Sequence, residues 1–315
     1  MDDNGETFAG QAMVFEPQML ASFDHRTGDV NEMQFLNADL LAVASSDGSV
    51  TLLKVQKDIV GSATLSTGIS LSKANHWPKI HTSCNGLSVS GDHIMSIGNE
   101  GKMFLLNVKR QSPIQTFAKA DSGSLSCALF LRQDQIAAAN SRGQVKIWDL
   151  RVGNTQDKQE PAKVCHLAMD LVGVTSLAKH PTQPHVLVGG GSNGVLGFWD
   201  LRGTQDYPLS VVKAHSEAVS EVHFHDQQPD HMFSCSQSGE TWHWNGSHLK
   251  LSTAGPNQKV NSCIWLNSEM VKNRIDTKPM MTKQALPINS MSIMGQSVLV
   301  AGDSEAIFLI PDIGL

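Results

Sequence analysis

Short apolar stretches alternate with small polar turns along most of the chain. Apolar runs of this length, bounded by Gly, Asn, Asp and Ser, are typical of strands joined by tight turns. The pattern therefore predicts a series of antiparallel hairpins. It recurs in six segments: LLAVASSDGSVTLLKV (40–55), HIMSIGNEGKMFLLNV (93–108), QIAAANSRGQVKIWDL (135–150), HVLVGGGSNGVLGFWDL (185–201), HMFSCSQSGETWHWNG (231–246) and SVLVAGDSEAIFLIPD (297–312).

The six segments align on the turn. Tight hairpin turns often need a residue with positive φ, which glycine adopts at little steric cost. Five segments carry glycine there, and the sixth carries Glu305: Gly48, Gly101, Gly143, Gly194 and Gly239. A large apolar side chain always follows five residues later: Leu53, Leu106, Trp148, Trp199, Trp244 and Ile310.

Further apolar stretches flank the hairpins. One precedes each hairpin, at 30–36, 84–90, 124–131, 174–180, 219–225 and 288–294, and a fourth candidate strand follows most of them, as at 113–120, 162–169 and 209–215. The turn glycines recur every 42 to 53 residues, close to the period of roughly 40–45 in WD40 repeats. Strands such as LLAVA are apolar on both faces, as expected for sheets packed between two neighbours. Glycine turns and the scarcity of long capped helices disfavour a helical solenoid.

The predicted fold is thus an all-β propeller of six repeat units. We expect one propeller domain over 18–315, preceded by a short acidic segment over 1–17.

Two units end in Trp-Asp, at Trp148-Asp149 and Trp199-Asp200, and Ala214-His215 introduces the next repeat. These residues resemble the WD40 family. The match is degenerate, because Trp244 is followed by Asn rather than Asp. The resemblance implies hydrogen-bond networks among a loop histidine, a strand Ser or Thr, a turn Asp and the tryptophan, of which only parts are identifiable here.

Longer stretches carry a closer resemblance. LRQDQIAAANSRGQVKIWDLR (131–151), VVKAHSEAVSEVHFHDQQPDHMFSCSQSGETWHWN (211–245) and VAGDSEAIFLI (300–310) are similar to the family of forty-three-kilodalton WD-repeat nucleoporins. That resemblance implies a non-catalytic structural subunit of the Y-shaped scaffold complex of the nuclear pore, supporting transport and mRNA export. It also implies partners among the other scaffold nucleoporins, and a place at the nuclear envelope and, in mitosis, at kinetochores.

The N-terminus departs from this family, whose propeller has seven blades. Only Glu6-Thr7-Phe8-Ala9 resembles the first hairpin, so the resemblance implies that most of one blade is missing here. We expect QMLASFD (18–24) to supply a fourth strand beside the C-terminal hairpin. This strand would close a six-bladed ring, because an open ring leaves strand edges unpaired.

Composition narrows the function classes. The net charge of −6 disfavours binding to a phosphate backbone. No run approaches the roughly 20 apolar residues of a membrane helix, and the acidic N-terminus does not read as a secretory signal. Five cysteines without a C-x-x-C pair argue against disulfides and a zinc ribbon, and for a reducing, intracellular compartment.

The sequence gives little support for a catalytic or ligand-binding site. Thirteen histidines include His223 and His225 on one expected strand, but metal sites need three or four convergent donors, so surface or turn positions are expected. The glycines at 189–191 precede a strand rather than the helix that a phosphate loop requires. No G-x-S-x-G motif occurs, and the cysteines fall mainly in apolar strands. Packing explains the repeat-aligned tryptophans better than base stacking. We predict no catalytic residue, cofactor or metal.

Two features suggest partner binding. Trp-Asp-Leu-Arg occurs twice, ending at Arg151 and Arg202, and is similar to the box by which some propellers dock on a cullin-RING ubiquitin ligase adaptor. A substrate receptor of such a ligase is therefore the alternative function. We favour the interpretation that each arginine caps the end of a strand in solvent, because isolated surface charges reveal little about binding. The segments 56–79 and 246–270 are predicted loops. Ile264 and Trp265 in the second would either anchor a partner or tuck against the propeller.

Overall fold

The structure is a computed structural model that describes residues 19, 21–24, 28–57, 63–66, 80, 82–110, 112–151, 160–249 and 263–315. Within these residues the strands form six antiparallel sheets. No helix in this part of the chain has the length and apolar character needed to cross a membrane.

Each sheet is a meander whose strands pair in chain order. The first contains β1 (Val30–Asn37), β2 (Leu40–Ser45), β3 (Val50–Lys57) and β4 (Ala63–Ser66). The second contains β5 (Cys84–Ser90), β6 (His93–Gly98), β7 (Met103–Asn107) and β8 (Gln115–Phe117). The third contains β9 (Leu125–Arg132), β10 (Gln135–Asn140), β11 (Gln144–Asp149) and β12 (Lys163–His166).

The remaining sheets follow the same plan. The fourth contains β13 (Val174–Lys179), β14 (Val186–Gly191), β15 (Val195–Asp200) and β16 (Ser210–Lys213). The fifth contains β17 (Val219–Phe224), β18 (His231–Ser236), β19 (Thr241–Asn245) and β20 (Asp276–Pro279). The sixth contains only β21 (Ile288–Met294), β22 (Ser297–Gly302) and β23 (Ile307–Ile310).

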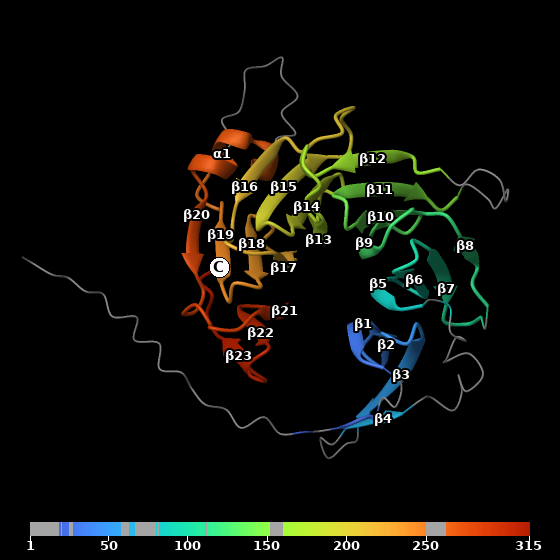
Figure 1. The fold of residues 1–315 in the computed structure, drawn as a ribbon. Coiled ribbons are helices and arrows are strands. Elements are labelled where there is room, and N and C mark those ends of the chain that lie inside the picture. The colour runs from blue at the N-terminus through green and yellow to red at the C-terminus, as the bar shows by residue number, and fades with distance from the viewer. Residues whose placement is uncertain are drawn as a thin grey trace, which may run out of the picture.

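The six sheets stand around a central axis as the blades of a propeller, with the first strand of each blade innermost (Figure 1). The blade of β1–β4 and the blade of β21–β23 lie at the two ends of the row. The predicted all-β fold of six hairpin-based blades is therefore confirmed. All six hairpins and the strands flanking them fall where the apolar pattern places them.

Neighbouring blades share apolar cores. Leu187 of β14 and Trp199 of β15, which pair in the fourth blade, pack with Ala137, Ile147 and Cys165 of the third. Both faces of β14 are buried along its whole length, because one face meets the preceding blade and the other the next. This explains why the strand sequences lack a simple alternation of polar and apolar residues.

A repeated bulge links the innermost strands. In each blade the register shifts around the second residue of the innermost strand. A bulged residue is left out of the ladder, so its side chain can be directed elsewhere. In four blades this side chain donates a hydrogen bond of 2.5 to 2.8 Å to the first backbone carbonyl of the next innermost strand: Asn31 to Cys84, Asn85 to Leu125, Ser126 to Val174 and Thr175 to Val219.

The fifth junction uses another side chain. Ser220 occupies the bulge, and its buried hydroxyl has no hydrogen-bond partner among the described residues. Instead, the carboxylate of Glu221 accepts a hydrogen bond from the backbone N–H of Met291 at 2.8 Å. We call these five blade-to-blade contacts, from β1 through β21, the latches.

The expected closing strand over 18–24 is wrong. Residues 19 and 21–24 lie outside any strand, while 18 and 20 fall outside the described residues. The sixth blade has three strands in the described part of the chain. Ring closure in other propellers depends on backbone pairing between strands, and residues 21–24 belong to none of the sheets in the described part of the chain.

The two predicted loops contain regular structure. Residues 63–66 of the first form β4, whereas 58–62 and 67–79 fall outside the described residues. Residues 264–266 of the second form a 3₁₀ turn, and Ser268–Asn273 forms the short helix α1. Asn267 begins α1, because its side-chain oxygen accepts hydrogen bonds from the backbone N–H groups of Glu269 and Met270.

Candidate functional site

The turn glycines join each hairpin to the loop that enters the next blade. All five have φ between 70° and 91°, namely Gly48, Gly101, Gly143, Gly194 and Gly239, and Glu305 in the sixth turn has φ of 56°. The carbonyl of Gly194 accepts hydrogen bonds from the backbone N–H groups of Ala214 and His215, both at 3.0 Å. The turns therefore position one face of the propeller.

Gly194→Ala is expected to destabilise the protein by roughly 2–4 kcal/mol. A left-handed backbone costs an L-residue about 1–2 kcal/mol, and an added Cβ would lie 2.3 Å from the carbonyl oxygen of His215. Gly91→Ala is the matched control, because φ is +57° and nothing lies within 4 Å of the added carbon. Urea unfolding of both variants measures the difference, and equal losses would contradict the steric argument.

The fifth blade holds the buried network that the WD40 resemblance implied only in parts. Nε2 of His215 lies 2.8 Å from Oγ of Ser234, which accepts a hydrogen bond from Nε1 of Trp244 at 3.0 Å. Nδ1 of His215 lies 3.6 Å from the carboxylate of Glu240. In the sequence, the dipeptide Ala214-His215 indicated this network. That Ser234 is the strand residue that bonds to His215 could be learned only from the structure.

The tryptophans at the same position in the third and fourth blades are packed in the core but take part in no such network among the described residues. Trp148 and Trp199 are buried, and their Nε1 atoms have no hydrogen-bond partner among the described residues. In the third blade, Asn140 donates a hydrogen bond to Asp121 at 2.7 Å, and Lys146 pairs with the same carboxylate at 2.8 Å. These residues connect the turn to the loop that precedes the blade.

Five described histidines are buried: His180, His215, His225, His231 and His243. The first three lie in connections between strands, whereas His231 and His243 lie within β18 and β19, so the expectation of surface or turn positions is wrong for these two. Nδ1 of His231 lies 2.8 Å from Nε2 of His243, and the two rings stack. Burial lowers the pKa of His180, His215 and His243 to about 4. A neutral histidine is the form that these apolar surroundings favour.

The buried histidines predict that stability falls with acidification. Their pKa of about 6.5 in the unfolded chain is higher than about 4 in the fold, so the unfolded state binds more protons between these values. Burial raises the pKa of Glu32 from 4.5 to about 7, which acts in the opposite direction over 4.5–7. Three groups outweigh one, so the urea midpoint should be lower at about pH 5 than at about pH 7.5. An equal or higher midpoint at acid pH would contradict the histidine argument.

In each of the two Trp-Asp-Leu-Arg segments, the arginine side chain bonds to the aspartate of the same segment. Arg151 donates two side-chain hydrogen bonds to Asp149, and Arg202 bonds to Asp200 in the same way. The Arg151 guanidinium lowers the pKa of the Asp149 carboxyl to about 2. Both arginines remain partly exposed, with side-chain exposures of 71% and 45%. Their charges are thus already paired within each segment.

The candidate partner anchor at Ile264 and Trp265 is buried. Trp265 is fully inaccessible, stacks on Phe198 and meets the edge of Phe224. Its Nε1 donates a hydrogen bond to the carbonyl of Pro229 at 2.9 Å. Of the two readings left open by the sequence, the structure shows the one in which this segment tucks against the propeller.

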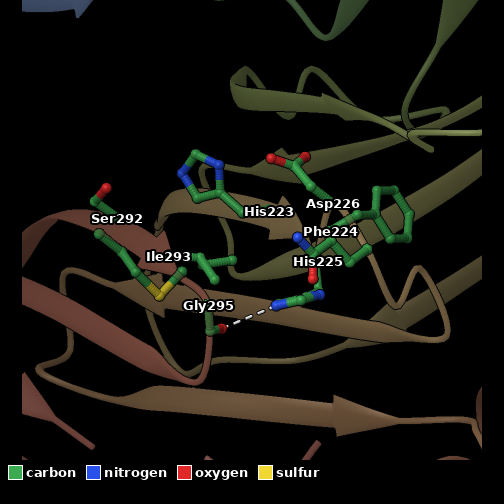
Figure 2. A pocket seen from close by; sticks show the side chains of 9 residues that line it. His223, Phe224, His225, Asp226, Ser292, Ile293 and Gly295 are labelled. Atoms are coloured by element: carbon green, nitrogen blue, oxygen red, sulfur yellow. Dashed lines mark hydrogen bonds between the residues drawn. The ribbon is translucent and has the colours of Figure 1, made fainter. Parts of the chain in front are cut away.

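His223 and His225 line one pocket of about 280 Å³ between the fifth and sixth blades. Figure 2 shows these residues, from the end of β17, opposite Ile293 and Gly295 at the end of β21. Nε2 of His225 lies 2.9 Å from the carbonyl of Gly295, and Nε2 of His223 lies 2.9 Å from Glu221. Each histidine therefore has a structural partner.

The buried carboxylates and a buried thiol are held in structural contacts. The carboxylates of Glu32 and Glu221 accept hydrogen bonds from backbone N–H groups of the neighbouring blades. Burial raises the pKa of the Cys165 thiol to about 11, which disfavours the nucleophilic thiolate. Within the described ranges, no three His, Cys, Asp or Glu side chains are grouped to hold a metal ion.

Six meander sheets, hairpin turns with glycine in left-handed conformation and the His-Ser-Trp network define a β-propeller of the WD-repeat class. The profile of the Nucleolar protein 10-like N-terminal β-propeller domain matches residues 87–315.

Among known proteins, nucleoporin Nup43 of Mus musculus is 32% identical over 326 residues, covering 93% of this chain and 81% of that protein. Nup43 of Homo sapiens is 31% identical over 320 residues, with the same shares covered. The nuclear pore complex protein nup43 of Dictyostelium discoideum is 29% identical over 194 residues, covering 59% of this chain and 44% of that protein. The chain belongs to the Nup43 family of WD-repeat nucleoporins.

Proposed function

We propose that the protein is a non-catalytic scaffold subunit of the nuclear pore complex. The family relation over 93% of the chain carries this proposal. The fold supports it, because a propeller presents rigid loops on two faces and suits the docking of several proteins. The buried histidines described above bond to or pack against neighbouring side chains, and burial disfavours the thiolate of Cys165, which agrees with a role in assembly rather than in chemistry.

The finer part of the proposal concerns the assembly. We place the protein in the Y-shaped scaffold complex, beside its large α-helical nucleoporins, where it supports nucleocytoplasmic transport and mRNA export. A second place at the kinetochore in mitosis belongs to the same proposal. Both rest on the resemblance of the repeat sequences to the forty-three-kilodalton nucleoporins.

Affinity purification of the tagged full chain, followed by quantitative mass spectrometry, tests this assignment. We expect Y-complex nucleoporins to be recovered in near-equal amounts, and the same subunits from mitotic cells together with kinetochore proteins. Recovery of a cullin adaptor without nucleoporins would contradict the proposal.

Arg151→Glu combined with Arg202→Glu should leave the recovery of nucleoporins unchanged within about twofold. The physical reason is that these arginines pair with Asp149 and Asp200 in their own segments, and exposed charges contribute little. Quantitative mass spectrometry of the variant beside the wild type measures the effect. Loss of an adaptor with retention of nucleoporins would show that the arginines serve a separate ligase contact.

A further inference from the structure

Exposed apolar side chains gather where the third blade meets the fourth. Between the end of β1 and the loop that enters the sixth blade, the exposed large apolar side chains of the described residues all lie between positions 169 and 211. Apolar residues that are exposed together mark interaction surfaces, whereas single ones are ordinary. We call these five residues the apolar patch: Met169, Leu171, Tyr207, Leu209 and Val211.

Two loops bring the patch together. Met169 and Leu171 lie in the loop between β12 and β13, with exposures of 91% and 82%, and the other three lie in or just after the loop between β15 and β16. The backbone N–H of His166, at the end of β12, donates a hydrogen bond to the carbonyl of Asp206 at 2.7 Å, and the ring centroids of His166 and Tyr207 are 5.7 Å apart. The second loop therefore lies beside the start of the first.

The packing beneath the patch joins the same two blades. Leu167, at the start of the first loop, packs with Trp199 of the fourth blade, and a Cβ added at Gly197 would lie 2.5 Å from the Leu167 side chain. Val211 pairs with Gly197, and paired residues in an antiparallel sheet share a face. Val211 therefore lies on the face of the fourth blade that meets Leu167, which is only two residues before Met169. The patch thus spans the boundary between the two blades.

A pocket opens at the patch. Its volume is about 240 Å³, and two patch residues line it together with residues of the second loop: Asp200, Gly203, Thr204, Gln205, Tyr207 and Leu209. Side chains that fill such pockets supply most of the binding energy of many interfaces. The pocket therefore suits one large apolar side chain of a partner.

An unpaired carboxylate defines the charge of that partner. Asp170 lies between Met169 and Leu171 and is exposed, and its carboxylate has no hydrogen bond or ion pair among the described residues. A partner that covered Met169 and Leu171 would remove this carboxylate from water, which is costly unless a cation pairs with it. The partner should therefore place Lys or Arg beside its apolar side chains.

The contact favours a helix over a strand. The second loop occupies the edge of β12 at His166, so a strand that extended the third blade there would have to displace this loop. The patch offers side chains rather than a free strand edge. An amphipathic helix presents apolar side chains at positions i, i+3, i+4 and i+7, with charged residues beside them.

Three other segments of this chain are poor occupants by composition. Residues 152–159 contain one large apolar residue, Val152. Residues 1–18 carry four acidic and no basic side chains, so their charge has the sign of Asp170. Gly255-Pro256 interrupts residues 250–262, and proline breaks a helix interior. A segment of another protein fits the patch better.

We infer that the apolar patch binds a basic amphipathic helix of another scaffold subunit. Its apolar side chains lie on the patch, one of them fills the pocket, and a Lys or Arg pairs with Asp170. The inference rests on the scaffold role proposed above and names the surface and the chemistry of one contact.

The first test uses the full chain with Met169→Asp and Leu171→Asp together. Both side chains are exposed, so the thermal midpoint should stay within about 3 °C of wild type. The matched control is Leu286→Asp with Met294→Asp, where the exposures are 47% and 67%. Recovery of Y-complex nucleoporins should fall by at least about tenfold for the patch variant and should be unchanged for the control. Equal recovery of the two variants would overturn the inference while leaving the scaffold role intact.

A charge reversal tests the basic character of the partner. Asp170→Lys should lower the recovery of nucleoporins by at least about fivefold, because it places a like charge beside the partner's cation. Asp226→Lys is the matched control, since Asp226 is an exposed carboxylate in the loop after β17. A loss for Asp170→Lys no larger than for Asp226→Lys would contradict a basic partner.

A photo-crosslinking residue identifies the occupant. With p-benzoylphenylalanine in place of Tyr207, we expect a crosslinked peptide from another scaffold subunit, with apolar residues at helical spacing and Lys or Arg beside them. A crosslink to another segment of this chain, to a second copy of it, or to a peptide without this pattern would overturn the inference. Failure of the wild-type chain to recover any scaffold nucleoporin would instead contradict the proposed function.

Discussion

Trp265→Ala is expected to destabilise the protein by about 3–5 kcal/mol, as for other buried tryptophans truncated to alanine. The ring is fully buried, its centroid lies 5.9 Å from that of Phe198 and 5.5 Å from that of Phe224, and the substitution leaves a cavity between them. It also removes the donor to the carbonyl of Pro229. Urea unfolding followed by circular dichroism measures the loss.

Trp265→Phe is the matched control. It retains a ring against Phe198 but loses the hydrogen bond to Pro229, so an intermediate loss is expected. A Trp265→Ala protein that unfolds at the wild-type urea concentration would show that the indole is not part of the core. It would restore the alternative of an exposed partner anchor.

Trp199→Ala should cost a similar amount, about 3–5 kcal/mol, for a different reason. Trp199 is 1% exposed and fills the core between the third and fourth blades, where it packs with Leu187 and Ile147. The cavity would therefore loosen one blade against the other. The free energy of unfolding in urea is again the measurement.

The matched variant Trp199→Phe separates packing from hydrogen bonding. Nε1 of Trp199 has no partner among the described residues, so phenylalanine loses only volume. We expect Trp199→Phe to lower the free energy of unfolding clearly less than Trp199→Ala does. Phenylalanine should also recover a larger share of the alanine loss at position 199 than at position 265, where it additionally loses a hydrogen bond. A Trp199→Phe protein as unstable as Trp199→Ala would point to an interaction of the indole N–H that the packing does not explain.

Much of the fold was predictable because its signals are local. Turn glycines with φ near +80°, such as Gly143 and Gly194, and the apolar strands on either side of them depend on neighbouring residues only. The innermost strand β5 falls on the predicted stretch 84–90. Repetition strengthened each weak signal, because six units agreed on one layout.

The latches were beyond prediction from one sequence. Asn31, Asn85, Ser126 and Thr175 are ordinary polar residues within strands, and only the bulge gives their side chains a common direction. Their acceptors lie 40 to 53 residues away in the chain. Such pairings depend on how two blades stand side by side, which hydrophobic patterns do not encode.

One expectation failed, and one question that the sequence left open was decided by the fold, for related reasons. The closing strand was inferred from the general cost of open edges, but residues 21–24 form no strand beside β23. Trp265 lies in a mostly polar stretch, and its burial depends on Phe198 and Phe224, which come from other strands. In both cases the outcome was decided by distant residues rather than by local composition.

The scaffold role makes a direct prediction about where the protein resides. A fluorescent tag on the endogenous full chain should give a punctate nuclear rim that coincides with other scaffold nucleoporins and recovers slowly after photobleaching. Slow recovery is expected because a stable subunit dissociates rarely. A diffuse nuclear or cytoplasmic signal, with no enrichment at pores, would contradict the account.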